Sequence, residues 1–241
     1  MKTVAFKDPK YVGDPINAVK IFNEKETDEL IVVDIDATVN GAEPDFKMIA
    51  NLAAECRMPL CYGGGVKTVA QANRIIELGV EKVAISSAAI ENPQLISDAA
   101  REIGGQSVVV VLDVKKDPRS GESMVWTHNG TRKTGRSVLS LAREAQERGA
   151  GEIVVNSIDN DGKMKGYDLA LARSVRDAVR LPITVLGGAG SLAHIGELLK
   201  ACGVIGAAAG SFFVFKGAYR AVLISYPAQA QKDQLVLASR T

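Results

Sequence analysis

The chain has 241 residues, of which 46% are hydrophobic and 24% are charged, and its formal net charge at pH 7 is +1. The length suits one domain with a substantial core, because an α/β barrel commonly runs to about 250 residues as a single domain. So small a net charge argues against a general nucleic-acid or anionic-membrane surface, since such surfaces usually carry a basic excess.

Short β-branched runs alternate with longer amphipathic segments along the chain. The predicted strands are residues 30–36, 59–62, 82–85, 107–113, 152–156, 182–186 and 207–209. The predicted helices are residues 15–25, 45–55, 69–78, 93–102, 137–148, 169–179 and 192–201. A hairpin is expected at 123–127 and 131–134, around an Asn-Gly turn. Nearly continuous apolar strands indicate a parallel sheet buried on both faces, and hence an α/β fold.

An internal repeat relates the two halves of the chain. Glu29-Leu30-Ile31-Val32-Val33 matches Glu152-Ile153-Val154-Val155-Asn156 about 123 positions later, and residues 59–65 match 182–188 at the same offset. Two halves of four βα units predict a (β/α)8 TIM barrel. The prediction is one domain over 1–241, with half-barrel repeats at about 1–104 and 105–228 and a loosely ordered tail at 229–241.

The repeat also predicts that one strand is missing. Only seven strands are found, and the counterpart of strand 107–113 would lie before Met1. We therefore expect the first strand to be absent from these residues and the true start codon to lie upstream.

From the residues given, we expect no targeting, membrane or metal signal. Residues 1–4 lead into charged residues rather than the apolar core of a signal peptide, and no apolar run approaches the roughly 20 residues of a membrane span. Cys56, Cys61 and Cys202 have no zinc-ligand spacing, so we expect reduced thiols, no metal or cofactor, and a cytoplasmic location.

Glycine-rich turns follow two equivalent strands, at 63–65 and 187–190. Glycine lets backbone N–H groups approach a phosphate closely, and the helix N-terminus that follows adds partial positive charge. The next strands end in Ser86-Ser87 and Gly210-Ser211, whose small and hydroxyl side chains would complete an anion cup. The alternative is a pair of tight turns without a ligand. Two symmetric cups favour a substrate with a phosphate at each end.

Polar side chains mark both ends of the predicted barrel. Asp113 ends the fifth strand of an eight-strand count, where it suits general acid/base chemistry; the alternative is an ion pair with Lys115 or Lys116. The same face carries Asp34, Asp36, Asp159 and Asp161, some of which could cap loops or helices, and Asn156 and Ser157 near the barrel axis. At the opposite face, Glu29, Lys82 and Glu152 begin strands, as a charged ring or as solvated strand ends. We interpret His128 as a hairpin residue and His194 as a helix-surface residue.

These residues resemble the cyclase subunit of imidazole glycerol phosphate synthase, an enzyme of histidine biosynthesis, from Lys2 to about Ala228. The resemblance is carried by the motifs Asp28-Glu29-Leu30, Asp34-Ile35-Asp36, Tyr62-Gly63-Gly64-Gly65, Glu91-Asn92-Pro93, Gly149-Ala150-Gly151-Glu152, Ser157-Ile158-Asp159-Asn160-Asp161-Gly162, Gly166-Tyr167-Asp168 and Gly187-Gly188-Ala189-Gly190. It implies a lyase that binds a bisphosphate formimino carboxamide ribotide. A glutaminase subunit would dock at the barrel bottom as a heterodimer and supply ammonia through the barrel.

The resemblance also implies roles for individual residues. Asp113 would be one of two acid/base aspartates, and Lys2 a catalytic loop lysine. The phosphate-binding positions would be Gly65, Ser86, Ser87, Gly162, Gly188, Gly210 and Ser211. Glu29, Lys82 and Glu152 would gate the ammonia path, and Asp34, Asn156 and Asp161 would lie at the catalytic face. The other aspartate and a gate arginine belong to the first strand, so we expect weak or absent turnover for the residues given.

Some segments depart from the main family pattern. Asn156 stands where the family usually has a threonine, and segments 6–15, 61–63, 213–217 and 220–227 are similar to a divergent branch found in surface-polysaccharide gene clusters. That similarity implies an alternative function, a non-catalytic barrel that channels ammonia to a sugar amidotransferase. The sister isomerase of the histidine pathway shares both phosphate sites, but the bottom charged ring and the 157–162 motif favour the cyclase.

Overall fold

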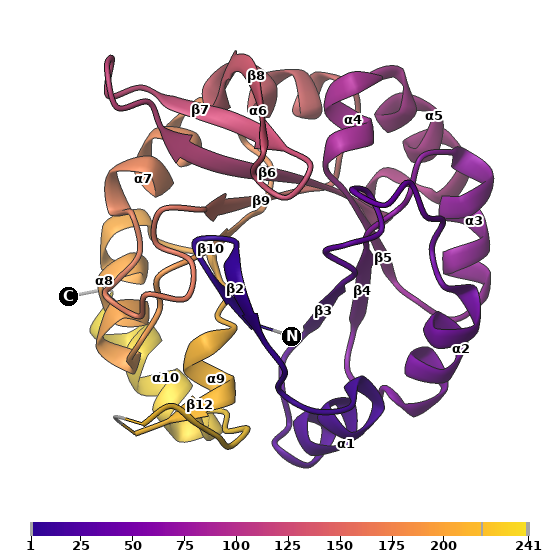
Figure 1. Cartoon of the computed structure of the whole chain (residues 1–241). Helices are drawn as coiled ribbons and strands as arrows, with labels where there is room; N and C mark the ends of the chain where they lie inside the picture. Colours follow the sequence, from indigo (N-terminus) through magenta and orange to yellow (C-terminus); the bar gives the residue numbers. More distant parts are fainter. Residues whose placement is uncertain (1, 218, 240–241) are drawn as a thin grey trace.

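A curled parallel sheet forms the centre of the computed structural model, which describes residues 2–217 and 219–239 and, for Lys2, the backbone alone. Its strands are β3 (Leu30–Val33), β4 (Leu60–Gly63), β5 (Lys82–Ile85), β6 (Val108–Lys116), β9 (Glu152–Ser157), β10 (Ile183–Leu186) and β11 (Gly206–Ala207). They pair in the order β11-β10-β9-β6-β5-β4-β3, so each strand lies beside its neighbour along the chain (Figure 1). The predicted α/β barrel architecture is confirmed, with β3 and β11 at the two ends of the paired path.

Helices surround the sheet on its outer face (Figure 1). They are α1 (Pro15–Glu24), α2 (Phe46–Glu55), α3 (Val69–Glu77), α4 (Ser87–Glu91), α5 (Gln94–Ile103), α6 (Val138–Glu147), α7 (Leu169–Ala178), α8 (Leu192–Cys202), α9 (Ser211–Val214) and α10 (Gln229–Ala238). Most long helices begin at a side chain that accepts a hydrogen bond from the backbone N–H three residues on. These capping residues are Asp14, Asp45, Thr68, Ser137, Asp168 and Ser191.

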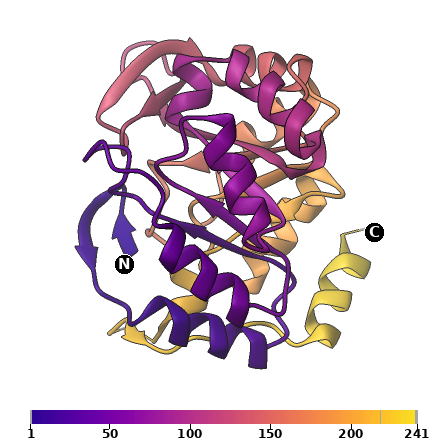
Figure 2. The same cartoon turned by 90° about the vertical axis from the view of Figure 1, so that its right-hand side faces the viewer.

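Within the described residues, three antiparallel hairpins extend from the barrel. β7 (Ser123–Thr127) and β8 (Arg132–Ser137) form the predicted one, and β6 continues to Lys116 because β7 pairs antiparallel with its end. The sequence pattern did not predict the other two, β1 (Lys2–Val4) with β2 (Lys7–Lys10), and β12 (Phe215–Lys216) with β13 (Ala221–Val222). Figure 2 shows the β1–β2 hairpin at one end of the barrel and α10 at the other.

The segment expected to be a loose tail forms α10. Leu235 on this helix packs against the core beside Gly196 of α8. Sequence periodicity gave no sign of the helix, since none of its residues is fully buried. No helix within the described residues is long and apolar enough to cross a membrane.

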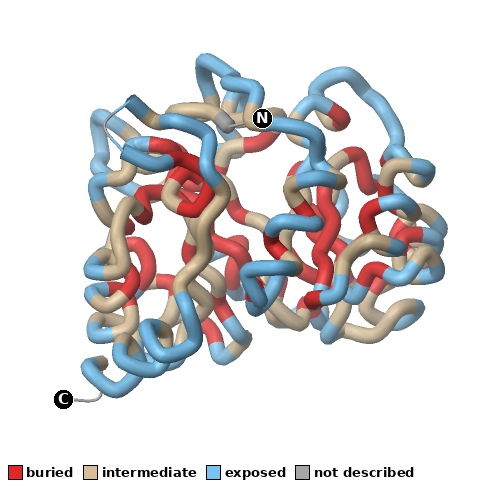
Figure 3. The backbone as a smooth tube through the Cα atoms, turned by 90° about the horizontal axis from the view of Figure 1, so that it is seen from below, coloured by how far each residue is buried: buried red, intermediate tan, exposed pale blue. Residues whose placement is uncertain are grey.

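The core has two parts, because alternate residues of a strand point to opposite faces. The larger part lies between sheet and helices and includes Ile49, Leu52, Ile75 and Leu198. A smaller cluster faces the barrel interior; its buried members are Cys61, Ala84, Val109 and Val154, with Ile31, Val111 and Leu186 packed against them. Figure 3 shows buried residues along the strands and exposed residues toward the periphery.

Candidate functional site

Asp113 and Asn156 meet at the carboxyl end of the sheet. They occupy matching positions on β6 and β9, and Asn156 Nδ2 donates a hydrogen bond to Asp113 Oδ1 at 3.0 Å. Burial raises the pKa of Asp113 to about 6, and the charge of Asp161 adds to the rise, while the side chains of Asn156 and Ser86 oppose it. A carboxyl with a pKa this close to neutrality can both accept and return a proton.

The ion-pair alternative for Asp113 does not form. Lys115 Nζ lies 5.2 Å from the ring centroid of Trp126, and Lys116 pairs with Asp168 at 2.9 Å. Because both lysines point elsewhere, the carboxyl of Asp113 is left to the barrel interior and to Asn156.

The raised pKa of Asp113 makes the free energy of unfolding depend on pH. Between the ordinary value of 3.8 and about 6, the folded protein holds a proton that the unfolded chain has released, so stability falls as pH rises through this window. We therefore expect Asp113→Asn, which removes the buried charge, to raise the unfolding temperature at pH 8 and to leave it unchanged at pH 4. Thermal unfolding at both pH values checks this.

Asp117 supplies a control of opposite sign. Its hydrogen bond from Lys133 lowers the pKa of its carboxyl to about 2, so its ionised form favours the folded state. That contribution is present above the ordinary pKa and is lost as pH falls through about 2. Asp117→Asn should therefore not stabilise the protein at pH 8. An equal response of the two variants would contradict the assignment of Asp113.

Asp161 binds the N-terminal hairpin, formed by β1 and β2, at the end of the barrel where the parallel strands finish. Its buried carboxylate accepts a hydrogen bond from Thr3 Oγ1 at 3.1 Å, and its carbonyl accepts one from Ala5 N at 3.0 Å. The hairpin reaches the β7–β8 turn, where the ring of Phe6 lies close to Gly130. The backbone of Lys2 pairs with Lys10 in this hairpin, whereas its side chain lies outside the described part of the chain.

The first glycine turn, between β4 and α3, requires glycine at two positions. Gly64 and Gly65 have φ values of 116° and 72°. A Cβ atom on Gly64 would lie 2.4 Å from the carbonyl oxygen of Asp34. At the start of α4, which follows the adjacent strand β5, Ser87 Oγ accepts a hydrogen bond from His128 N at 3.2 Å, and His128 lies in the hairpin turn as expected. Ser86 Oγ is buried near the Asp113 carboxyl, whose pKa it lowers, but it makes no hydrogen bond of good geometry to any described residue.

The second turn, between β10 and α8, has the same construction. Gly188 has a φ of 112°, and a Cβ atom there would lie 2.0 Å from the carbonyl oxygen of Gly166. His194 is half-buried rather than at the surface, because its Nδ1 accepts a hydrogen bond from Gly190 N at 3.2 Å. Gly210 precedes α9, and Ser211 Oγ is the second buried hydroxyl that finds no partner among the described residues.

Gly162 connects the second turn region to the N-terminal hairpin. Its φ is 70°, and a Cβ atom would lie 2.2 Å from the carbonyl oxygen of Thr3. Gly203 has a matching φ of 71° but no atom within 4 Å of such a Cβ. Alanine would cause the same backbone strain at Gly162 and at Gly203, but it would clash with a neighbour only at Gly162. A comparison of the two substitutions therefore separates strain from steric clash.

We expect Gly162→Ala to release the N-terminal hairpin, because the new methyl group must displace Thr3. Trypsin should then cleave after Lys7 and Lys10 at least tenfold faster, whereas Gly203→Ala should leave that cleavage rate unchanged. Equal cleavage of the two variants, measured by mass spectrometry of limited digests, would show that Gly162 does not hold the hairpin.

Asp34 serves as a loop cap rather than as a group free at the mouth. Its Oδ1 accepts hydrogen bonds from the backbone N–H groups of Asp36 at 3.0 Å and Ala37 at 3.1 Å. Asp159 likewise binds backbone, accepting from Lys116 N at 3.0 Å. These are the capping roles that the sequence left open for both residues.

At the opposite end of the barrel, Lys82 binds two carboxylates. Its Nζ lies 2.9 Å from Glu29 Oε1 and 2.9 Å from Glu152 Oε2. Burial alone would lower the pKa of Lys82, but hydrogen bonds to Glu152 and Glu29 raise it above its usual value. Thr184 Oγ1 also donates to Glu152 Oε1 at 2.6 Å. The sequence did not identify Thr184, although the repeat pairs it with Cys61 of the interior.

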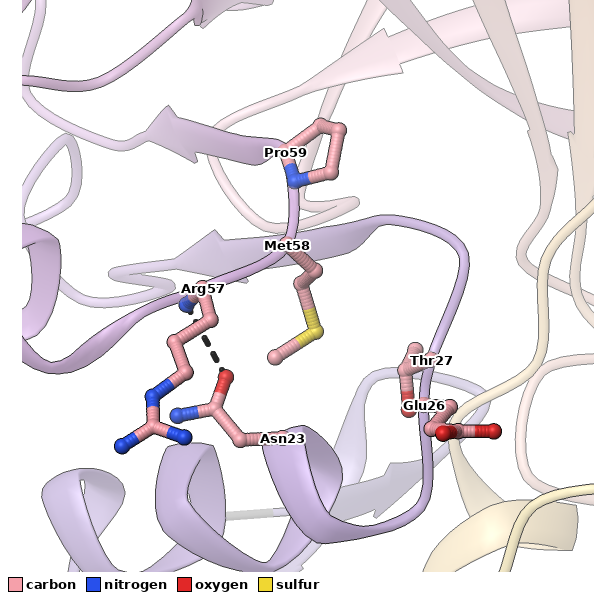
Figure 4. A pocket seen from close by; sticks show the side chains of 6 residues that line it. All are labelled: Asn23, Glu26, Thr27, Arg57, Met58 and Pro59. Carbon is pink, nitrogen blue, oxygen red and sulfur yellow. Dashed lines mark hydrogen bonds between the residues drawn. The ribbon is translucent and has the colours of Figure 1, made fainter.

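A separate cavity of about 350 Å³ opens near the starts of β3 and β4 (Figure 4). Its lining residues are Asn23, Glu26, Thr27, Arg57, Met58 and Pro59. The Asn23 amide bridges its wall, donating to Glu55 O at 2.8 Å and accepting from Arg57 N at 3.0 Å. The cavity lies at the end of the strands away from Asp113. Among the described residues, no cluster of three or more His, Cys, Asp or Glu side chains could hold a metal ion.

Comparison with known proteins gives consistent matches. A family model described as histidine biosynthesis protein matches residues 1–220. A putative imidazole glycerol phosphate synthase subunit HisF of Leptospira borgpetersenii is 55% identical over 98% of this chain and 92% of its own. The putative subunit hisF3 of Vibrio vulnificus is 55% identical over 97% and 90%. An imidazole glycerol phosphate synthase subunit HisF of Exiguobacterium sibiricum is 41% identical over 88% and 84%.

Proposed function

This chain belongs to the histidine biosynthesis protein family, and from that premise we propose that it is a cyclase-type subunit of an imidazole glycerol phosphate synthase. One observation supports the proposal most strongly. The half-buried carboxyl of Asp113 and the lysine–carboxylate cluster around Lys82 lie at opposite ends of one apolar barrel interior. An apolar interior resists the passage of ions, so it suits the delivery of a small neutral molecule to a reaction centre.

In the proposed reaction, ammonia from glutamine and a bisphosphate formimino carboxamide ribotide give imidazole glycerol phosphate, an aminoimidazole carboxamide ribotide and one molecule of water. Asp113 would move protons during ring closure, since its pKa of about 6 leaves it largely ionised at neutral pH and still able to take up a proton. Lys2 would contribute from the N-terminal hairpin, in which the next residue, Thr3, donates a hydrogen bond to Asp161.

The two glycine turns would hold the phosphate groups. The buried Ser211 hydroxyl supports this assignment, because native proteins rarely leave such a group without a hydrogen-bond partner and a phosphate oxygen would supply one. Ser86 would contribute its hydroxyl from the equivalent place in the first half of the barrel. The remaining proposed contacts come from the backbone or side chains of Gly65, Ser87, Gly162, Gly188 and Gly210.

The proposed partner is a glutaminase subunit, docked as a heterodimer at the end of the barrel that carries Glu29, Lys82 and Glu152. These side chains would close the entrance until ammonia is released. The cluster is partly exposed at this end, which would let a docked partner rearrange it.

Calorimetric titration tests substrate binding. We expect the bisphosphate ribotide to bind at least 100-fold more tightly than either half-molecule that carries one phosphate, because two cups engage it at once. Ser86→Ala and Ser211→Ala should each weaken binding about tenfold, whereas Ser239→Ala, just after α10, should not. Equal affinity for one and two phosphates would rule out paired cups.

Addition of a glutaminase separates this function from ammonia delivery to a sugar amidotransferase. Cyclase function predicts product from the bisphosphate ribotide when glutamine is present. Binding and stimulation of the glutaminase without conversion of that substrate would instead favour a non-catalytic barrel that channels ammonia.

A further inference from the structure

The side-chain oxygen of Asn156 is buried and has no partner. Asn156 is 6% exposed, its Nδ2 donates to Asp113, and its Oδ1 accepts no hydrogen bond from any described residue. The amide orientation follows from this contact, because the reverse would set Oδ1 against an ionised carboxylate oxygen. Native proteins rarely leave a buried acceptor unpaired, so this oxygen indicates that a bound molecule supplies the missing hydrogen bond.

The position of Asn156 in the barrel indicates which molecule would donate to its oxygen. Glu152, Val154 and Asn156 alternate along β9 and so face the barrel interior together. Glu152 belongs to the charged cluster at the bottom, and Val154 to the apolar cluster above it. Asn156 is therefore the first polar side chain on β9 above the apolar layer, and it stands beside Asp113.

We propose that Asn156 Oδ1 accepts a hydrogen bond from the ammonia molecule that emerges from the apolar interior and holds its nitrogen next to Asp113. This inference rests on the proposed function and names a binding residue for its small substrate. An acceptor holds ammonia through one N–H group and leaves the nitrogen lone pair free to attack, whereas a donor would occupy that lone pair. One N–H of Nδ2 is engaged by Asp113, and Oδ1 is the buried polar atom of Asn156 that has no partner among the described residues.

Nuclear magnetic resonance tests the contact without turnover. In ¹⁵N-labelled protein, the side-chain NH2 signal of Asn156 is identified by its loss in Asn156→Thr. Titration with ammonium chloride at pH 9 should shift this signal in a saturable way, and sodium chloride at equal ionic strength should not. An amide signal that ignores ammonium, or responds equally to sodium, would overturn the proposal.

Steady-state kinetics with free ammonia supply a second readout. Asn156→Ala should raise the KM for ammonia about 3–10-fold, the loss of one hydrogen bond, and leave the KM for the bisphosphate unchanged. Asn156→Thr, which keeps an acceptor oxygen, should restore much of the ammonia KM. A purely structural role would instead change both KM values or kcat alone, and that pattern would count against the proposal.

The two readouts separate this inference from the proposed function. If the unsubstituted protein neither binds nor converts the bisphosphate, the cyclase assignment fails while the amide titration still decides whether Asn156 binds ammonia. If turnover occurs but neither the amide signal nor the ammonia KM responds, the cyclase assignment stands and the Asn156 proposal falls.

Discussion

Asp113→Asn is expected to lower kcat for ammonia-dependent turnover about 10²–10⁴-fold, the range usual for loss of a positioned acid or base. Asparagine has nearly the same shape, so binding of the bisphosphate should change little. The rate of the unsubstituted protein should fall as pH drops below about 6, as the carboxyl becomes protonated. Rates measured by product formation across pH 5–9 check both expectations.

Asp117→Asn is the matched control for this experiment. It makes the same chemical change further along the chain, where the carboxylate bonds to Lys133 of the β7–β8 hairpin. Its kcat should stay within about threefold of the unsubstituted value. A comparable loss of kcat in the two variants would show that Asp113 has no specific role in the reaction.

Lys82→Met is expected to have the second largest effect. Removing the ammonium group leaves Glu29 and Glu152 facing each other without a counter-charge, which should lower the free energy of unfolding by about 1–3 kcal/mol, less than for a fully buried pair because these side chains are partly exposed. Glutamine-dependent turnover should fall more than ammonia-dependent turnover, because free ammonia does not need the gate.

Two variants make the Lys82 result specific. The exposed Lys20–Glu55 pair predicts a change of less than about 0.5 kcal/mol for Lys20→Met. Combining Lys82→Met with Glu29→Gln and Glu152→Gln removes the unpaired charges and should recover at least half of the lost stability. Failure of the triple variant to recover, seen in urea unfolding, would show that repulsion is not the cause.

Much of the barrel could be predicted because its strands are buried on both faces and read as apolar runs. Predicted and observed strands agree to within a few residues, and helix starts follow capping side chains such as Thr68. The two missed hairpins have no such pattern. The first is fixed by contacts of Thr3 and Ala5 with Asp161, and the other by pairing of Leu223 N with Val214 O, which only the folded chain creates.

The candidate site divides in the same way. The repeat identified both glycine turns. Because parallel strands all start at the same end of a barrel, the sequence also placed Glu29, Lys82 and Glu152 together there. Three-dimensional structure was needed to show that Asp34 caps its own loop and that the oxygen of Asn156 lacks a partner. A hydrogen bond that is absent leaves no sign in the sequence.

Isotope competition tests the central claim most directly. Glutamine labelled with ¹⁵N in its side-chain amide is supplied with glutaminase and the bisphosphate, while excess unlabelled ammonium is present in solution. Passage through the barrel predicts that imidazole glycerol phosphate, however slowly it forms, retains most of the ¹⁵N label. Product whose label is diluted to the level of the bulk ammonium would contradict it.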